Sequence, residues 1–154
     1  MSTPSQPNYS IHSIIAAYGI GLIPHGYYFV TMMANARGQA SNLLPRENLS
    51  TLKSSLPSQI WTKLAKARGA HLNAMENLPL FAVAMLAGNV AKLPADELNT
   101  LSLEYLGARI LYMAAYMGAR SEAISYVRTG LWAWSVSIPI MALVKAGKAF
   151  DGAA

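Results

Sequence analysis

Long stretches with few charged residues alternate with polar connections along this chain, and they predict four helices. The first stretch, about residues 10–36, contains no Asp, Glu, Lys or Arg and is long enough to cross a bilayer core of about 30 Å. Three further helices are expected over about residues 58–90, 97–119 and 126–149. The pattern therefore predicts an all-α fold, an integral membrane four-helix bundle that forms a single domain over residues 1–154.

The connections between the predicted helices are polar. Residues 37–57 are rich in Pro, Asn and Ser and indicate a loop, long enough to suggest a folded or functional cap. Residues 92–96 and 120–125 are interpreted as turns. Four spans place both termini on one side of the membrane. Lys and Arg are in excess in the first and third connections, so the positive-inside rule predicts that these two face the cytosol.

Composition supports a membrane location and excludes several kinds of site. Hydrophobic residues make up 53% of the chain and charged residues only 12%, whereas soluble domains average about 25% charged residues. A soluble, alanine-rich bundle is the alternative, and the membrane-length stretches argue against it. Because the chain has no cysteine, any thiol chemistry must use a thiol from a ligand. Three histidines without ligand spacing predict no metal site, and dispersed basic residues predict no nucleic-acid partner.

Polar side chains recur at helical spacing inside the predicted helices. Residues three or four apart are neighbours on a helix, and ionisable residues in membrane helices are costly unless they are paired, so they are candidates for function. The candidates are Lys66, Asn73, Glu76 and Asn77 on the second helix, Tyr105, Arg109, Tyr112 and Tyr116 on the third, and Arg128 in the expected first turn of the fourth.

This set of side chains suits a small anionic peptide. Arginine and lysine bind carboxylates, and arginine can do so in a bidentate manner. Glu76 suits an amine, while Asn73 and Asn77 suit peptide-like amides. A zwitterionic peptide with two carboxylates meets all these demands, and glutathione is one. The alternative is that Glu76 pairs with Arg109 or Arg68 and only holds the helices together.

Several runs of sequence resemble the MAPEG family, the membrane-associated proteins of eicosanoid and glutathione metabolism. ARGAHLNAMENLPLF (67–81), YLGARILYMAAY (105–116) and YVRTGLW (126–132) are similar to the signatures of its second, third and fourth helices. NLLPRENL (42–49) is similar to a loop of its bacterial and fungal branch. The runs occur in the family's order and cover most of the chain.

The resemblance implies a homotrimer with three sites between adjacent subunits, each holding a bent glutathione that faces the cytosol. The residues expected to bind glutathione are Lys66, Arg68, Asn73, Glu76, Asn77, Arg109, Tyr112 and Tyr116. Gly69 departs from the family, because eicosanoid-forming members have Arg there, and Lys66 or Arg68 is the expected substitute. The catalytic residues are expected to be Arg128, Tyr112 and Tyr116, with Arg120 as the rival of Arg128 beside the thiolate.

The implied function is that of a membrane-bound, glutathione-dependent transferase or peroxidase acting on a lipophilic electrophile. An arginine would stabilise the thiolate, and membrane lipid would surround the trimer. In a eukaryotic cell the resemblance implies the endoplasmic reticulum. Two alternatives remain: a glutathione-independent isomerase or cyclase of a lipophilic metabolite in the same intersubunit pocket, and a non-catalytic membrane scaffold.

Overall fold

The structure, a computed structural model, describes residues 6–152. Over this range it is helical and contains no strand, so the predicted all-α class is confirmed. The helices are α1 (Ser10–Asn35), α2 (Asn48–Thr51), α3 (Ser58–Val90), α4 (Ala95–Gly118) and α5 (Glu122–Asp151). Among the described helices, α1 and α5 are long and apolar enough to cross a membrane. Only 17% and 22% of the residues in their apolar windows are buried, so these helices turn most of their apolar surface outward.

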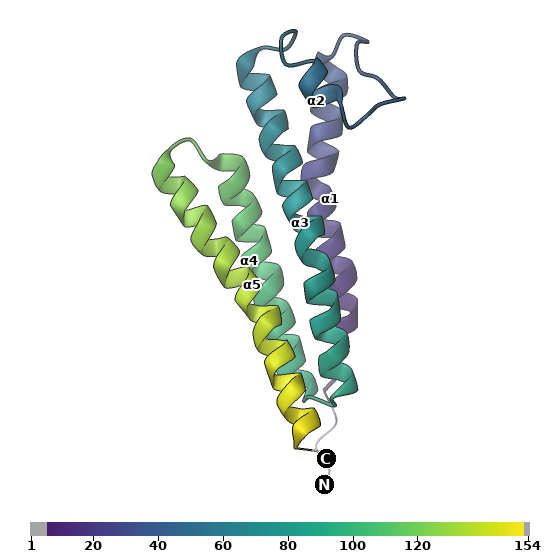
Figure 1. Cartoon of the computed structure of the whole chain (residues 1–154), viewed down its shortest axis with the longest axis vertical. Coiled ribbons are helices and arrows are strands. Elements are labelled where there is room, and N and C mark those ends of the chain that lie inside the picture. The colour runs from purple at the N-terminus through teal and green to yellow at the C-terminus, as the bar shows by residue number, and fades with distance from the viewer. Residues whose placement is uncertain (1–5, 153–154) are drawn as a thin grey trace.

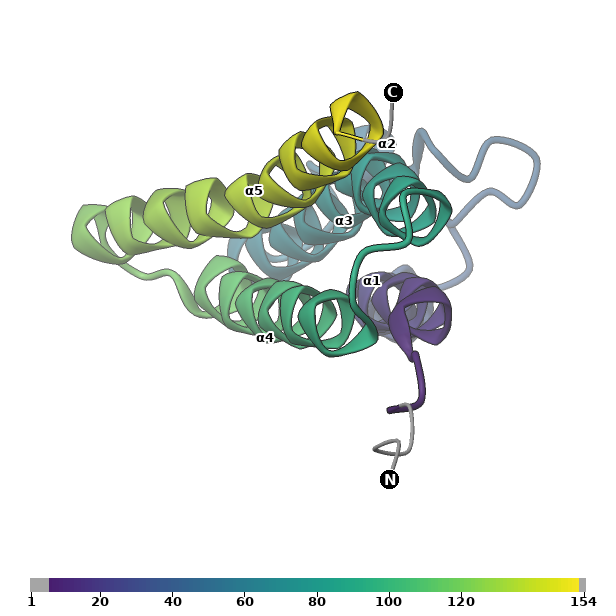
Figure 2. The ribbon, with the colours of Figure 1, turned by 90° about the horizontal axis from the view of Figure 1, so that it is seen from below.

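The long helices run side by side as two pairs (Figure 1), with α1 beside α3 and α4 beside α5. The start of α1 and the end of α5 lie at the same end of the bundle, which we call the lower end after its place in Figure 1. The α4–α5 turn and the segment that contains α2 lie at the opposite, upper end. At the upper end the α4–α5 pair leans away from α3 (Figure 1). At the lower end the long helices lie closer to one another, as the view from below shows (Figure 2).

Asparagine side chains fasten the start of the described chain to the lower end of the bundle. Asn8 Nδ2 donates to Asn89 Oδ1 on α3 at 2.8 Å, and Asn89 Nδ2 donates to Ser10 Oγ at 2.8 Å. Asn99 on α4 accepts from the Tyr9 amide at 2.7 Å. Because these contacts join three helices, the lower end is tightly closed.

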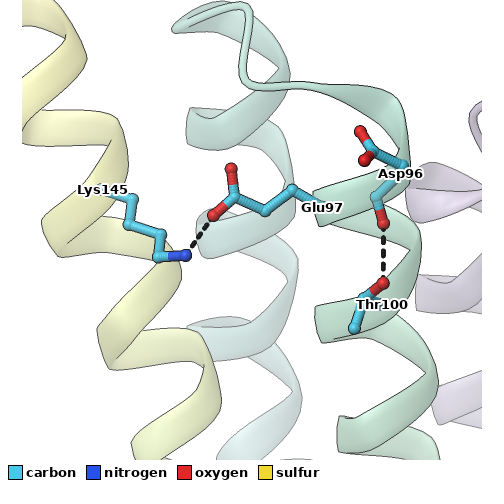
Figure 3. Close-up of polar contacts among 4 residues, drawn as sticks. All are labelled: Asp96, Glu97, Thr100 and Lys145. Atoms are coloured by element: carbon cyan, nitrogen blue, oxygen red, sulfur yellow. Dashed lines mark hydrogen bonds and ion pairs between the residues drawn. The ribbon is translucent and has the colours of Figure 1, made fainter.

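A second lower contact joins α4 to α5. Lys145 on α5 forms an ion pair with Glu97 in the first turn of α4 (Figure 3). In the same turn the Asp96 carbonyl accepts from Thr100 Oγ1 at 2.8 Å. The acidic residues here also lie at the positive end of the α4 dipole, where negative charge is favourable.

The core between the pairs combines stacked rings with small residues. Phe81 on α3 and Tyr105 on α4 are buried, and their rings stack with centroids 3.9 Å apart. Ala84, Ala108 and Ala142 are fully buried beside them. Small residues let helix backbones approach closely, which is how membrane helices gain packing energy.

The connection from α1 to α3 is a folded segment. It contains α2, and its Leu52 and Leu56 are buried against Met32 and Leu64. Trp61 Nε1 donates to the Leu49 carbonyl at 2.8 Å. The polar composition of this segment predicted a loop, and these buried leucines are the reason that it folds against α1 and α3.

Helix α5 begins at Glu122, four residues before the expected start at 126. The Ser121 side chain accepts from the Ile124 amide and caps the helix. Only residues 119–121 therefore separate α4 from α5. Arg128 becomes the seventh residue of α5 and does not lie in its first turn, as the sequence suggested. It lies beyond the reach of the helix-dipole effect, which fades within one turn.

Candidate functional site

The polar residues of α3, α4 and α5 meet at the guanidinium of Arg109. Arg109 lies in the middle of α4 and is 5% exposed. Its Nη2 donates to Asn73 Oδ1 on α3 at 2.9 Å, and its Nη1 lies 3.4 Å from Ser135 Oγ on α5. The guanidinium also lies over the Tyr112 ring, 4.7 Å from its centroid. One buried cation thus joins three helices.

A second cation continues this cluster toward the upper end. The Arg128 guanidinium lies over the Tyr116 ring, 4.8 Å from its centroid, and its Nη2 donates to Ser125 Oγ at 2.9 Å. The rings of Tyr112 and Tyr116 meet edge to face, 5.7 Å apart. Cations are attracted to aromatic faces, so two guanidiniums and two phenols form one connected row. We call the group of Asn73, Arg109, Tyr112, Tyr116 and Arg128 the arginine–tyrosine cluster.

Because Gly69 on α3 has no side chain, the Tyr116 hydroxyl can lie directly against α3. A Cβ atom at position 69 would lie 2.4 Å from Tyr116 Oη and 3.0 Å from its Cζ, which is closer than packed atoms approach. A side chain at position 69 and the observed Tyr116 position therefore exclude each other. The residue that departs from the family pattern thus contacts a predicted site residue.

The remaining predicted residues of α3 lie around the cluster. Asn77 Nδ2 donates to the Asn73 carbonyl at 2.8 Å, so it adjoins the cluster. Lys66 is half-buried and its Nζ donates to the Ala119 carbonyl at the end of α4. Glu76 is exposed. Within residues 6–152 the ion pair at the lower end is the only one, so the alternative pairing of Glu76 with an arginine does not form there.

Arg68 is not brought together with the cluster. It lies on the α1 side of α3 and lines a separate cavity of about 390 Å³ with His25, Tyr28, Arg46, His71 and Leu72. In this cavity His71 Nδ1 is 2.9 Å from the Gly21 carbonyl, which agrees with the structural role that the sequence favoured for His71.

Sequence reasoning missed Ser135 and the contact of Gly69. Ser135 is fully buried and its Oγ also donates to the Trp132 carbonyl at 2.8 Å. A serine within an apolar membrane helix was the available signal. The Gly69 contact depends on the position of α4, and no local pattern on α3 reveals it.

The cluster is suited to binding anions. Arg109 has a neutral amide, a hydroxyl and aromatic faces as partners in the described structure. A buried cation without a counter-charge costs several kcal/mol, and a bound carboxylate or thiolate offsets that cost. The phenols of Tyr112 and Tyr116 add hydroxyl groups able to donate a proton.

Comparison with known proteins extends beyond the short motifs. The family model described as MAPEG family matches residues 14–148, nearly the whole chain, and includes every residue of the arginine–tyrosine cluster. The resemblance seen in the separate runs is therefore confirmed. No curated protein matches, and no solved structure matches.

Proposed function

Because this chain belongs to the MAPEG family, we propose that it is a membrane-bound enzyme that joins glutathione to a lipophilic electrophile, or reduces a lipophilic peroxide with it. The family includes glutathione transferases, peroxidases and isomerases. The chain is a helical membrane protein with outward apolar helices, so a substrate dissolved in the bilayer has access to it. We assign the chemistry to a single MAPEG-like domain, in the endoplasmic reticulum if the cell is eukaryotic.

The observation that carries this proposal is the burial of Arg109 among neutral partners. Arg109 is 5% exposed, and no acidic side chain forms an ion pair with it within residues 6–152. Arginine binds carboxylates through two parallel hydrogen bonds. A carboxylate of glutathione therefore provides the negative counter-charge that Arg109 lacks within the protein.

The neighbours of Arg109 fit the rest of the peptide. Asn73 and Asn77, linked by their own hydrogen bond, offer amide donors and acceptors to the peptide bonds. Glu76 is exposed on the same helix and is assigned to the amine. Lys66 lies at the upper border and is assigned to the second carboxylate.

We propose that the site lies between adjacent subunits of a homotrimer. Arg68 lies on the α1 side of α3, with Arg46 and His71, while Arg109 lies on the side of α4 and α5. Within one subunit the two arginines thus have different neighbours. If subunits pack with these faces together, Arg68 of the partner subunit joins the ligand bound at Arg109.

The residues of the cluster divide the chemical work. Bound glutathione supplies the thiol that attacks the electrophile. Arg128 lies beside Tyr116 and favours the thiolate, because a nearby guanidinium stabilises an anion. The hydroxyl of Tyr112 or Tyr116 donates a proton to the charge that develops on the electrophile. The apolar surroundings exclude water and so strengthen these interactions.

Glutathione is expected to raise the melting temperature of the purified protein in detergent. A ligand at one hundred times its dissociation constant stabilises the folded state by about 2.7 kcal/mol. The measurement is a thermal melt over a glutathione titration, with the diamide of glutathione as the control that lacks both carboxylates. Equal melting curves with and without glutathione contradict the proposal. That result favours the glutathione-independent isomerase or cyclase, or the scaffold.

Replacing Gly69 by Ala is expected to lower turnover several-fold. The new methyl group displaces the Tyr116 hydroxyl, and with it the ring on which Arg128 lies. Alanine favours a helix over glycine by about 1 kcal/mol, so the fold is not weakened by propensity. Gly107→Ala is the matched control, because a Cβ at position 107 meets nothing within 4 Å. Equal turnover in the two variants contradicts the proposed role of Gly69.

A further inference from the structure

A wide cleft opens at the upper end, above the arginine–tyrosine cluster. The first turns of α3 and the end of α4 border it, and its volume is about 780 Å³. It lies where the α4–α5 pair leans away from α3 (Figure 1). Most of the residues that line it have polar side chains, namely Ser58, Gln59, Thr62, Lys63, Lys66 and Arg120. The cleft therefore presents hydrophilic side chains at the water-facing end of a largely apolar chain.

The charge of this cleft has one sign. Lys63, Lys66 and Arg120 line it, and no carboxylate does. Lys63 and Arg120 are exposed. Helix α3 starts here without a side-chain cap, so the positive end of its dipole adds to the field. A cleft lined by like charges concentrates ions of the opposite sign.

The cleft adjoins the proposed site, although its lining contains no residue of the arginine–tyrosine cluster. Lys66 crosses its inner border, where Nζ donates to the Ala119 carbonyl. The next position along the same face of α3 is Gly69, which touches the Tyr116 hydroxyl, and Met117 lines the cleft beside Tyr116. Gly69 lies three residues, or about one helical turn, beyond Lys66 on α3, so the border of the cleft lies about one turn of α3 from the Tyr116 hydroxyl.

We propose that this cleft is the aqueous entrance of the site, and that Lys63 and Arg120 capture the carboxylates of the anionic peptide before Arg109 binds one of them. The inference rests on the proposed function and assigns to Lys63 and Arg120 an effect on the rate at which the ligand associates. Glutathione has two carboxylates and one amine, so it is a net anion at neutral pH. Electrostatic steering in a charged cleft raises association rates about 10- to 1,000-fold and weakens with salt.

The test compares association rates of glutathione in stopped-flow experiments at low and high salt. The protein is the full chain in phosphatidylcholine nanodiscs, which keep anionic head groups out of the measurement. Lys63→Gln/Arg120→Gln is expected to bind about tenfold more slowly than the wild type at low salt, and equally fast at high salt. Lys63→Gln alone is expected to lower kcat/KM and leave kcat unchanged. Lys148→Gln, at the lower end, removes one charge as Lys63→Gln does and is the matched control for that single variant; it is expected to bind as the wild type does.

The outcomes separate this inference from the proposed function. If the wild type and the double variant show the same salt dependence, the entrance is overturned while glutathione binding stands. If the wild type does not bind glutathione, the proposed function fails. Citrate, a polycarboxylate without a thiol, then tests whether the cleft binds carboxylates. Citrate is then expected to raise the Tm of the wild type and of Lys148→Gln but not that of the double variant. Equal shifts in all three overturn the cleft as a carboxylate site.

Discussion

Replacing Arg128 by Ala is expected to remove most of the conjugating activity, with a fall in turnover of about thirtyfold at pH 7. A cysteine-type thiol has a pKa of about 8.5, so a few per cent is ionised at neutral pH without help. A guanidinium within about 6 Å lowers such a pKa by about 1–3 units and makes the thiolate the main species. The variant loses this help while Arg109 still binds the peptide.

The pH dependence of kcat identifies the cause of that loss. The wild-type rate is expected to be nearly flat above neutral pH, because its thiol is already ionised. The Arg128→Ala rate is expected to climb until about pH 8.5, where the unassisted thiol ionises. Size-exclusion chromatography is expected to show the same oligomer, a trimer if our proposal holds, for the variant and the wild type. If turnover in Arg128→Ala is unchanged, Arg128 does not stabilise the thiolate. If turnover at saturating glutathione falls in Arg120→Ala but not in Arg128→Ala, that function belongs to Arg120.

Replacing Arg109 by Met is expected to weaken glutathione binding about 100-fold. A hydrogen bond to a charged group is worth up to about 3 kcal/mol, and each 1.4 kcal/mol is about tenfold in affinity. Methionine has a similar length and suits the apolar surroundings. Without ligand the variant is expected to melt near the wild type, because the removed charge had no ionic partner.

Calorimetric titration of glutathione into the two proteins measures this difference. Arg109→Lys is the control that keeps the charge and loses the planar, bidentate group, and its affinity is expected to lie between the other two. Wild-type affinity in Arg109→Met contradicts the assignment of Arg109 to a carboxylate. A variant that no longer folds, detected by loss of its helical circular dichroism, assigns Arg109 to the structure instead.

Much of the helical layout follows from local sequence. The uncharged stretch before Arg37 predicts α1 to within one residue, and Pro57 followed by Ser58 marks the start of α3. The start of α5 was misplaced because the polar run from Arg120 to Ser125 has the composition of a turn. The helix start depends on one capping serine, Ser121, and a single capping residue is too weak a signal to predict a helix within a polar run.

The candidate site was predictable only where it follows helical spacing. Asn73 and Arg109 fall on faces that spacing identifies, and the structure joins them at 2.9 Å. Arg68 is about 140° away from Asn73 around an ideal helix, and the structure places it in another cavity. Contacts between helices, such as that of Gly69 with Tyr116, depend on the tilt and rotation of whole helices. No pattern within one helix contains that information.

The short turn between α4 and α5 has a mechanical consequence. Only three residues, 119–121, join α4 to α5 at the upper end, and the ion pair of Lys145 and Glu97 holds the same two helices together at the lower end. We therefore expect the pair to tilt as one body about its lower-end contacts with the start of the described chain, such as that of Asn99 with the Tyr9 amide. Helix α4 has 24 residues, about 36 Å at 1.5 Å per residue. A rotation of about 5° at the pivot shifts the far tip by about 3 Å, the diameter of a water molecule. The contacts of the lower end are therefore expected to set how wide the cleft at the upper end opens.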